Sequence, residues 1–308
     1  MNKFKNDPLK GLIYSLMSTI LLSTNFITAK YALEGFNPET FSLLWTLSAS
    51  IYSLTLIFLT NNFKKIFIPG KIHNKIILIG LVTGIGMILG WSGLARLDPS
   101  FASFLARFRP VITILLSIIF LKERFIASEI IPILIIITGA FVSAIGRWDT
   151  IGVGMILVLL SACMASVQML IAKMIVNIHR VPSIILSFYR VFIAFIIILL
   201  WNIITGKMKF DVQPNYYQVT FLGAFLGPCL SWILMYASYS HWDLSRSSII
   251  SMSQPLFVLP MAYFILRRLP ATRGLYGGVL ILIGAFWLTW IQFAERRKME
   301  TIGKIEFP

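Results

Sequence analysis

Two prolines inside long apolar stretches, each preceded by a polar residue, are the first features that could do chemistry. Arg109 precedes Pro110, and Gln254 precedes Pro255. A proline within a helix removes a backbone donor and pushes on the carbonyl four residues earlier, so the helix bends and frees polar backbone groups. An arginine beside such a bend can bind a carboxylate or phosphate through two parallel hydrogen bonds. The alternatives are a packing kink at each proline and an Arg109 that caps the carbonyls of a neighbouring helix.

A second arginine, Arg107, lies two residues before Arg109. That separation is about 200° around an α-helix, so we expect the two side chains to point to different faces. We expect Arg109 to line a cavity, because Gln254 is its counterpart beside the other bend. Arg107 should then meet a polar group on a neighbouring helix or reach toward the membrane surface.

Four further side chains form matching pairs along the chain and are candidates for contact with a small molecule. Asn25 and Gln168 occupy equivalent places in the first and sixth apolar stretches, and Trp91 matches Tyr236 at a shift of 145 residues. The amides could bind a ligand or hydrogen-bond between helices. The aromatic rings could contact a ligand, or they could serve packing and the interfacial belt.

Catalytic, metal and cofactor sites are not expected from the sequence. No Asp or Glu lies in the middle of an apolar stretch, and no Walker A, HExxH or GxSxG sequence occurs. These patterns supply the phosphate-binding loop, the zinc ligands and the nucleophile of large enzyme classes. We therefore expect no carboxylate proton relay, no bound metal or cofactor, and no ATP-driven pumping by this chain alone.

The composition places the chain in a membrane. Charged residues make up 13% of its 308 residues, against about 25% in soluble proteins. Hydrophobic residues make up 57% and the mean hydropathy is +0.84, which excludes disordered, collagen-like and ordinary soluble chains. The net charge of +15 does not indicate nucleic-acid binding, because the basic residues are spread over short segments between apolar stretches. The two cysteines, Cys163 and Cys229, lie in apolar runs, which excludes a disulfide framework.

The apolar stretches predict the fold class. A bilayer core needs about 20 apolar residues per helix. Ten segments meet this requirement: 11–32, 40–60, 75–95, 100–121, 127–146, 152–173, 183–204, 217–239, 244–266 and 275–293. We predict an all-α polytopic membrane protein with ten transmembrane helices. Asn37-Pro38-Glu39 marks one helix start with an N-cap residue, a proline and an acid in the first turn.

An internal repeat divides these helices into two halves. At a shift of 145 residues Pro110 falls on Pro255, and Gly139-Ala140-Phe141 falls on Gly284-Ala285-Phe286. We predict two repeats, over residues 11–147 and 151–293, with five helices each. Because five is odd, the second repeat must start on the other side of the membrane. Inverted repeats of this kind are typical of secondary transporters, with a substrate site near the midplane.

The distribution of Lys and Arg predicts the orientation. With the N-terminus inside, fifteen of the 27 basic residues lie on the cytoplasmic side and eight on the outer side. The remaining four, Arg107, Arg109, Arg190 and Arg246, lie within predicted spans. Since cytoplasmic loops carry an excess of Lys and Arg, both termini are expected in the cytoplasm.

Several short segments resemble the EamA-like family of the drug/metabolite transporter superfamily. Leu22-Ser23-Thr24-Asn25-Phe26 followed by Lys30 is similar to that family's first-helix signature. Pro110-Val111-Ile112-Thr113 followed by Leu121-Lys122-Glu123-Arg124 is similar to its fourth-helix signature, and Pro182 through Arg190 is similar to its second-helix pattern. The resemblance covers nearly the whole chain as two tandem units.

The resemblance implies a secondary transporter in the cell (inner) membrane. It would move small organic metabolites, such as amino-acid-like, anionic or zwitterionic solutes, by alternating access, as an exporter or exchanger. Its partners would be a small-molecule solute and the lipid bilayer; the oligomeric state stays open. The alternative is a membrane-embedded enzyme acting on a lipid, against which the lack of a paired-acid or metal constellation counts.

The orientation can be tested with an impermeant thiol reagent. Single cysteines placed in 205–215 and in 267–273, in a protein lacking Cys163 and Cys229, should react from outside the cell. The expected result follows from the charge bias, which puts both segments on the outer side. Labelling from the cytoplasm alone would contradict the ten-span inverted topology.

Overall fold

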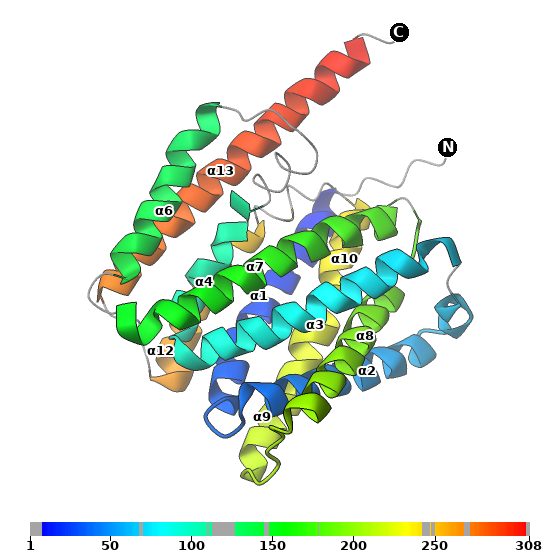
Figure 1. Ribbon diagram of the computed structural model, residues 1–308. Coiled ribbons are helices and arrows are strands. Elements are labelled where there is room, and N and C mark those ends of the chain that lie inside the picture. The colour runs from blue at the N-terminus through cyan, green and yellow to red at the C-terminus, as the bar shows by residue number, and fades with distance from the viewer. Residues whose placement is uncertain are drawn as a thin grey trace.

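The computed structural model describes residues 8–67, 70–109, 111–112, 127–144, 148–177, 179–241, 247, 250–267 and 272–305. Every regular element in these residues is a helix (Figure 1), as the long apolar stretches predict. Seven helical stretches in this part of the chain are long and apolar enough to cross a membrane, and two shorter apolar helices cover Ile130–Val142 and Ile250–Leu266. The structure is therefore that of a multi-pass membrane protein.

The helices form two groups along the chain, before and after residues 145–147. The first half contains α1 (Pro8–Ala32), α2 (Pro38–Leu59), α3 (His73–Arg96), α4 (Pro99–Leu105) and α6 (Ile130–Ala144), together with the short 3₁₀ turns η1 (Phe63–Ile66), η2 (Gly70–Ile72), η3 (Ala106–Phe108) and η4 (Ala127–Glu129). The second half contains α7 (Trp148–Asn177), α8 (Ser183–Thr205), α9 (Pro214–Ala224), the π-helical segment η5 (Phe225–Ser231), α10 (Trp232–His241), α12 (Gln254–Leu266) and α13 (Thr272–Ile305).

Local sequence signals explain several boundaries. Asn37 is the N-cap of α2, and its side-chain oxygen accepts a hydrogen bond from the backbone N–H of Thr40 at 3.3 Å, as the Asn37-Pro38-Glu39 pattern predicts. The predicted span 217–239 is one continuous helical stretch, Pro214–His241, in which Pro228 lies within the π-helical segment. Parts of the predicted spans 100–121 and 244–266 lie outside the described residues.

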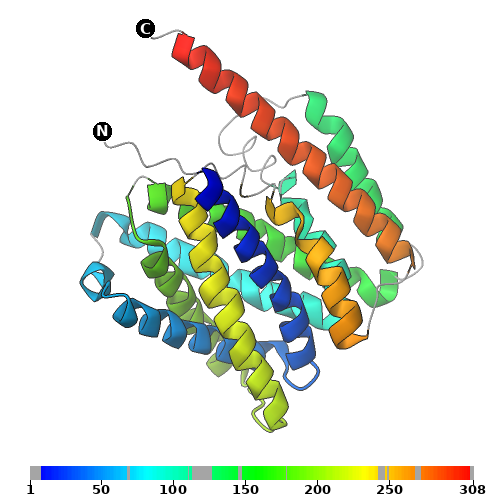
Figure 2. The same ribbon diagram turned by 180° about the vertical axis from the view of Figure 1, so that it is seen from behind.

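The two halves pack helix against helix. α3 packs on α7, α1 on α9, η5 and α10, α2 on α8, α4 on α12, and α6 on α13. Figures 1 and 2 show α6 and α13 side by side as one flank of the molecule, and they place the first turn of α1 and the last turn of α13 at the same end. Each repeat therefore buries its helices mainly against the other repeat.

Glycines allow these close contacts. A Cβ at Gly90 of α3 would lie 2.7 Å from Oγ of Ser161 on α7, and a Cβ at Gly93 would lie 2.9 Å from the carbonyl oxygen of Gly154. Small residues let helix backbones approach in membranes, where packing and hydrogen bonds replace the hydrophobic effect as the cause of helix association. Gly90 and Gly93 therefore allow α3 and α7 to pack closely.

The contact between α6 and α13 depends on two glycines that the internal repeat aligns. A Cβ at Gly139 would lie 2.6 Å from the carbonyl oxygen of Gly277, and one at Gly284 would lie 2.8 Å from that of Pro132. Because these neighbours are backbone atoms, Gly139→Ala and Gly284→Ala should each destabilise the protein by about 1–3 kcal/mol. A lower thermal unfolding midpoint of the purified protein in detergent would show this.

Gly70→Ala is the matched control for these two substitutions. A Cβ at Gly70 would lie 3.9 Å from Nδ1 of His73, which is an ordinary contact, so the unfolding midpoint should stay at the wild-type value. Equal midpoints for all three variants would contradict the packing argument.

Candidate functional site

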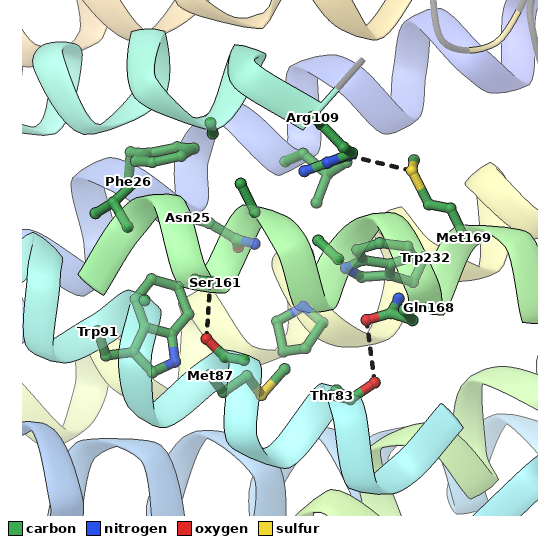
Figure 3. A pocket seen from close by; sticks show the side chains of 18 of the residues that line it. Asn25, Phe26, Thr83, Met87, Trp91, Arg109, Ser161, Gln168, Met169 and Trp232 are labelled. Carbon is green, nitrogen blue, oxygen red and sulfur yellow. Dashed lines mark hydrogen bonds between the residues drawn. The ribbon is translucent and has the colours of Figure 1, made fainter. Parts of the chain in front are cut away.

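A cavity of about 180 Å³ lies between the two halves. Helices of both repeats line it: α1, α2, α3, α4 and η3 from the first, and α7, α8, η5, α10 and α12 from the second. Figure 3 shows its interior, with Asn25 and Phe26 from α1 and Thr83, Met87 and Trp91 from α3 facing Ser161, Gln168 and Met169 from α7. A small cavity at a repeat interface is a suitable place for a small-molecule site.

Arg107 connects the two repeats across one side of this cavity. Its guanidinium is 2% exposed. Nη1 donates to the carbonyl oxygen of Ser251 at 2.5 Å, and Nη2 donates to Oε1 of Gln254 at 2.6 Å. The Ser251 carbonyl is the one that Pro255 pushes aside, four residues later in the chain. Arg107 therefore takes the carbonyl-capping role that the sequence offered as an alternative for Arg109.

Arg109 extends from the same segment toward α7. Its Nη1 lies 3.3 Å from Sδ of Met169 (Figure 3), and its carbonyl oxygen accepts a hydrogen bond from Oγ of Ser166 at 3.3 Å. The expectation that only one of the two arginines lines the cavity is wrong, because both do. They point to different faces as expected, Arg107 to α12 and Arg109 to α7, but the cavity borders both helices.

A third arginine, Arg190 of α8, is buried and also lines the cavity. Its Nη2 donates to the carbonyl oxygen of Pro228 at 2.6 Å, inside the π-helical segment. Its guanidinium carbon lies 4.7 Å from the centroid of the Trp232 ring, a cation–π arrangement. From the sequence, Arg190 was placed within a predicted span and in a family pattern but was not included among the candidate site residues, although a charge within a span is a signal for a functional site.

The two matched amides, Asn25 and Gln168, differ in their hydrogen bonding. Gln168 lines the cavity and is held on both sides: Oε1 accepts from Oγ1 of Thr83 at 3.0 Å, and Nε2 donates to the hydroxyl of Tyr236 at 3.1 Å. Tyr236 is fully buried behind Gln168 and is not part of the described lining. Asn25 also lines the cavity, and its Oδ1 is buried without a hydrogen-bond partner.

Two tryptophans form an aromatic end of the cavity. Trp45 of α2 and Trp91 of α3 both line it, with ring centroids 5.6 Å apart and ring planes at 69°. Phe41 packs against both, at 4.9 Å from Trp45 and 5.4 Å from Trp91. The indole nitrogens of both tryptophans are buried without a hydrogen-bond partner. A buried donor left without a partner costs about 1–3 kcal/mol, so both N–H groups are candidates for ligand contact.

Of the remaining expected residues, two lie at the start of α12 and one lies outside the described residues. Gln254 lines the cavity at the start of α12, and Pro255 follows it as a buried residue in the first turn. Pro110 lies outside the described residues, as does Arg246. Within the described lining the charged side chains are three arginines, with no Asp or Glu among them.

The chain was compared with known proteins. The family model described as "EamA-like transporter family" matches residues 9–145 and 152–290. A crystal structure of another protein covers 91% of this chain and 96% of its own, with 17% sequence identity and a TM-score of 0.63, so the two share a fold. A search of curated proteins found no match. Two family units that span both halves, built around a cavity at their interface, show that the chain belongs to the EamA-like transporter family of the drug/metabolite transporter superfamily, a family of membrane transporters.

Proposed function

We propose that this chain is a secondary transporter that moves small organic solutes with an anionic group, including zwitterionic amino-acid-like solutes, by alternating access in the cell (inner) membrane. Export or exchange is the proposed mode. The observation that carries this proposal is a cavity at the repeat interface whose described lining has three arginines, two of them buried, and no Asp or Glu.

The argument from charge starts with the cost of burying arginines. A buried guanidinium needs compensation, and backbone carbonyls supply only partial charges. Arg107 and Arg190 bind the carbonyl oxygens of Ser251 and Pro228. A carboxylate or phosphate on the solute would add the full negative charge that the described lining does not contain. The planar guanidinium fits either group through two parallel hydrogen bonds.

The proposed architecture is ten transmembrane helices in two inverted five-helix repeats. The reciprocal packing supports it, since α1 packs on the α9–α10 stretch while α3 packs on α7. An approximate two-fold axis between the halves would relate these two contacts to each other. The end of α13 near the start of α1 supports an even number of crossings, as both termini in the cytoplasm require (Figures 1 and 2).

The proposed moving parts are the broken helices beside the cavity. The α12 bend at Pro255 places Gln254 at the cavity and the Ser251 carbonyl at Arg107. Arg107 belongs to the first repeat and its partners to the second, so its two hydrogen bonds must change if the repeats rock against each other. Pro110 would provide the equivalent bend in the first repeat.

Substitution of Arg109 tests the anion-binding role. Arg109→Lys and Arg109→Gln should leave membrane insertion and abundance near normal but reduce solute transport in liposomes by about tenfold or more, because lysine cannot reproduce the paired hydrogen bonds. Arg107→Gln is the comparison variant: it removes the bonds to Ser251 and Gln254 and should mainly lower folding yield.

Transported solutes can be identified by loading proteoliposomes with a metabolite mixture and analysing the transported fraction by mass spectrometry.

Gln254→Ala should reduce transport less than the Arg109 variants do. If Arg109→Gln transports at the wild-type rate with unchanged apparent affinity, Arg109 is structural and the anionic-solute proposal loses its main support.

The energy source can be tested separately. Acidic side chains are absent from the described lining of the cavity, so we expect exchange or facilitated diffusion without strict proton coupling. Uptake into liposomes preloaded with solute should persist when the pH gradient is collapsed with an ionophore. Complete loss of uptake would show that an acid near a helix end, such as Asp98 or Asp243, carries protons.

A further inference from the structure

The aromatic end of the cavity contains two hydrogen-bond donors that the protein itself does not use. Trp45 is 0% exposed, and the indole nitrogens of Trp45 and Trp91 are both buried without a partner in the described chain. Most buried donors in proteins are hydrogen-bonded, so a pair of unused donors in one cavity wall calls for an explanation.

The surrounding packing holds the two rings in place. Trp45 contacts Phe41 and Trp91, and its six-membered ring fits against α9 only because residue 223 is glycine. A Cβ at Gly223 would lie 2.6 Å from Cη2 and Cζ3 of Trp45. Trp45 lies near the start of α2 and Trp91 near the end of α3. These are consecutive helices that pack on each other, which puts both donors at one end of the cavity.

The arginines occupy another part of the cavity. Figure 3 shows Trp91 on one side of the pocket and Arg109 with Met169 on the other, and Arg190 stacks on Trp232 near Gln168. A solute whose anionic group lies near the arginines therefore extends its other end toward the two tryptophans.

We propose that the transported solute carries a hydrogen-bond acceptor at the end remote from its negative charge, and that the indole N–H groups of Trp45 and Trp91 donate to it. The solute class is an organic anion with a distal carbonyl or carboxylate. One carbonyl or carboxylate oxygen has two lone pairs and can accept from both tryptophans. Both N–H groups are buried in the solute-free structure, so the proposal requires the two rings to turn out of this packing when the solute binds. This inference rests on the proposed function and adds the second recognition element to it.

The test uses pairs of anions that differ only in the distal acceptor. Pentanoate and 4-oxopentanoate form one pair, and hexanoate and 5-oxohexanoate form another; the two members of each pair have the same charge and chain length. Each anion is titrated at millimolar concentration into the purified full-length protein in detergent. The dissociation constant follows from the rise in the thermal unfolding midpoint, since a ligand that binds only the folded protein stabilises it.

The tryptophan N–H groups are removed by Trp45→Phe and Trp91→Phe, which keep an aromatic ring. Wild-type protein should bind the acceptor-bearing member of a pair about fivefold or more tightly than its partner. Both variants should bring that ratio toward one without weakening the acceptor-free anion. Trp232→Phe is the matched control and should keep the ratio, because Trp232 lies under the Arg190 guanidinium. The unfolding midpoint without ligand reports whether each variant folds.

The outcomes separate this inference from the proposed function. Equal binding of both members of each pair to wild-type protein, or a ratio that survives both substitutions, overturns the acceptor site and leaves the anionic-solute proposal standing. If none of the anions stabilises the protein while the corresponding amines do, the anionic-solute proposal is wrong, and the acceptor inference is overturned with it.

Discussion

The structure depends on one constraint: a polar group in the interior of a membrane protein has no water to bind, so another part of the protein must satisfy it. The second repeat departs from regular α-helix at the π-helical segment that contains Pro228 and at the start of α12, where Pro255 lies in the first turn. Arg190 donates to the carbonyl of Pro228, and Arg107 donates to the carbonyl of Ser251. Ser231 supplies a third donor, to the carbonyl of Gly227. The irregular helical segments offer carbonyl oxygens as acceptors, and these carbonyls partly compensate the charge of Arg107 and Arg190.

This pairing also shapes the cavity. The arginines that satisfy the broken turns lie at the interface of the repeats, so satisfying the backbone also places positive charge beside the space where a solute fits. Glycines on α3 bring α7 close, and Gly223 makes room for Trp45, which keeps the cavity small and partly aromatic. The two sides differ in chemistry: Arg109 and Met169 lie on one, and Trp91 lies on the other (Figure 3), with Trp45 beside it.

Much of the candidate site could be predicted because its signals are local. A polar residue within an apolar stretch must face protein or water, and this reasoning placed Asn25, Gln168 and Arg109 at the cavity, where the structure has them. Trp45 and Arg190 were not included among the candidate site residues. An aromatic residue in a span usually serves packing, and the position of Arg190 along the chain does not tell how close its helix lies to the cavity. Tyr236 lies behind Gln168, since helix rotation decides which side of a wall a residue occupies.

The sequence by itself determined the class of this protein: apolar stretches of bilayer length, two units of one transporter family, and arginines within apolar stretches that require compensation. These follow from length, hydropathy and residue type, which act locally along the chain. Only the tertiary structure decided which partner each arginine has. Arg107 and Arg109 are two residues apart, yet one binds the broken α12 and the other contacts α7. That choice depends on how helices 144 and 60 residues away along the chain are packed, and no local pattern contains that information.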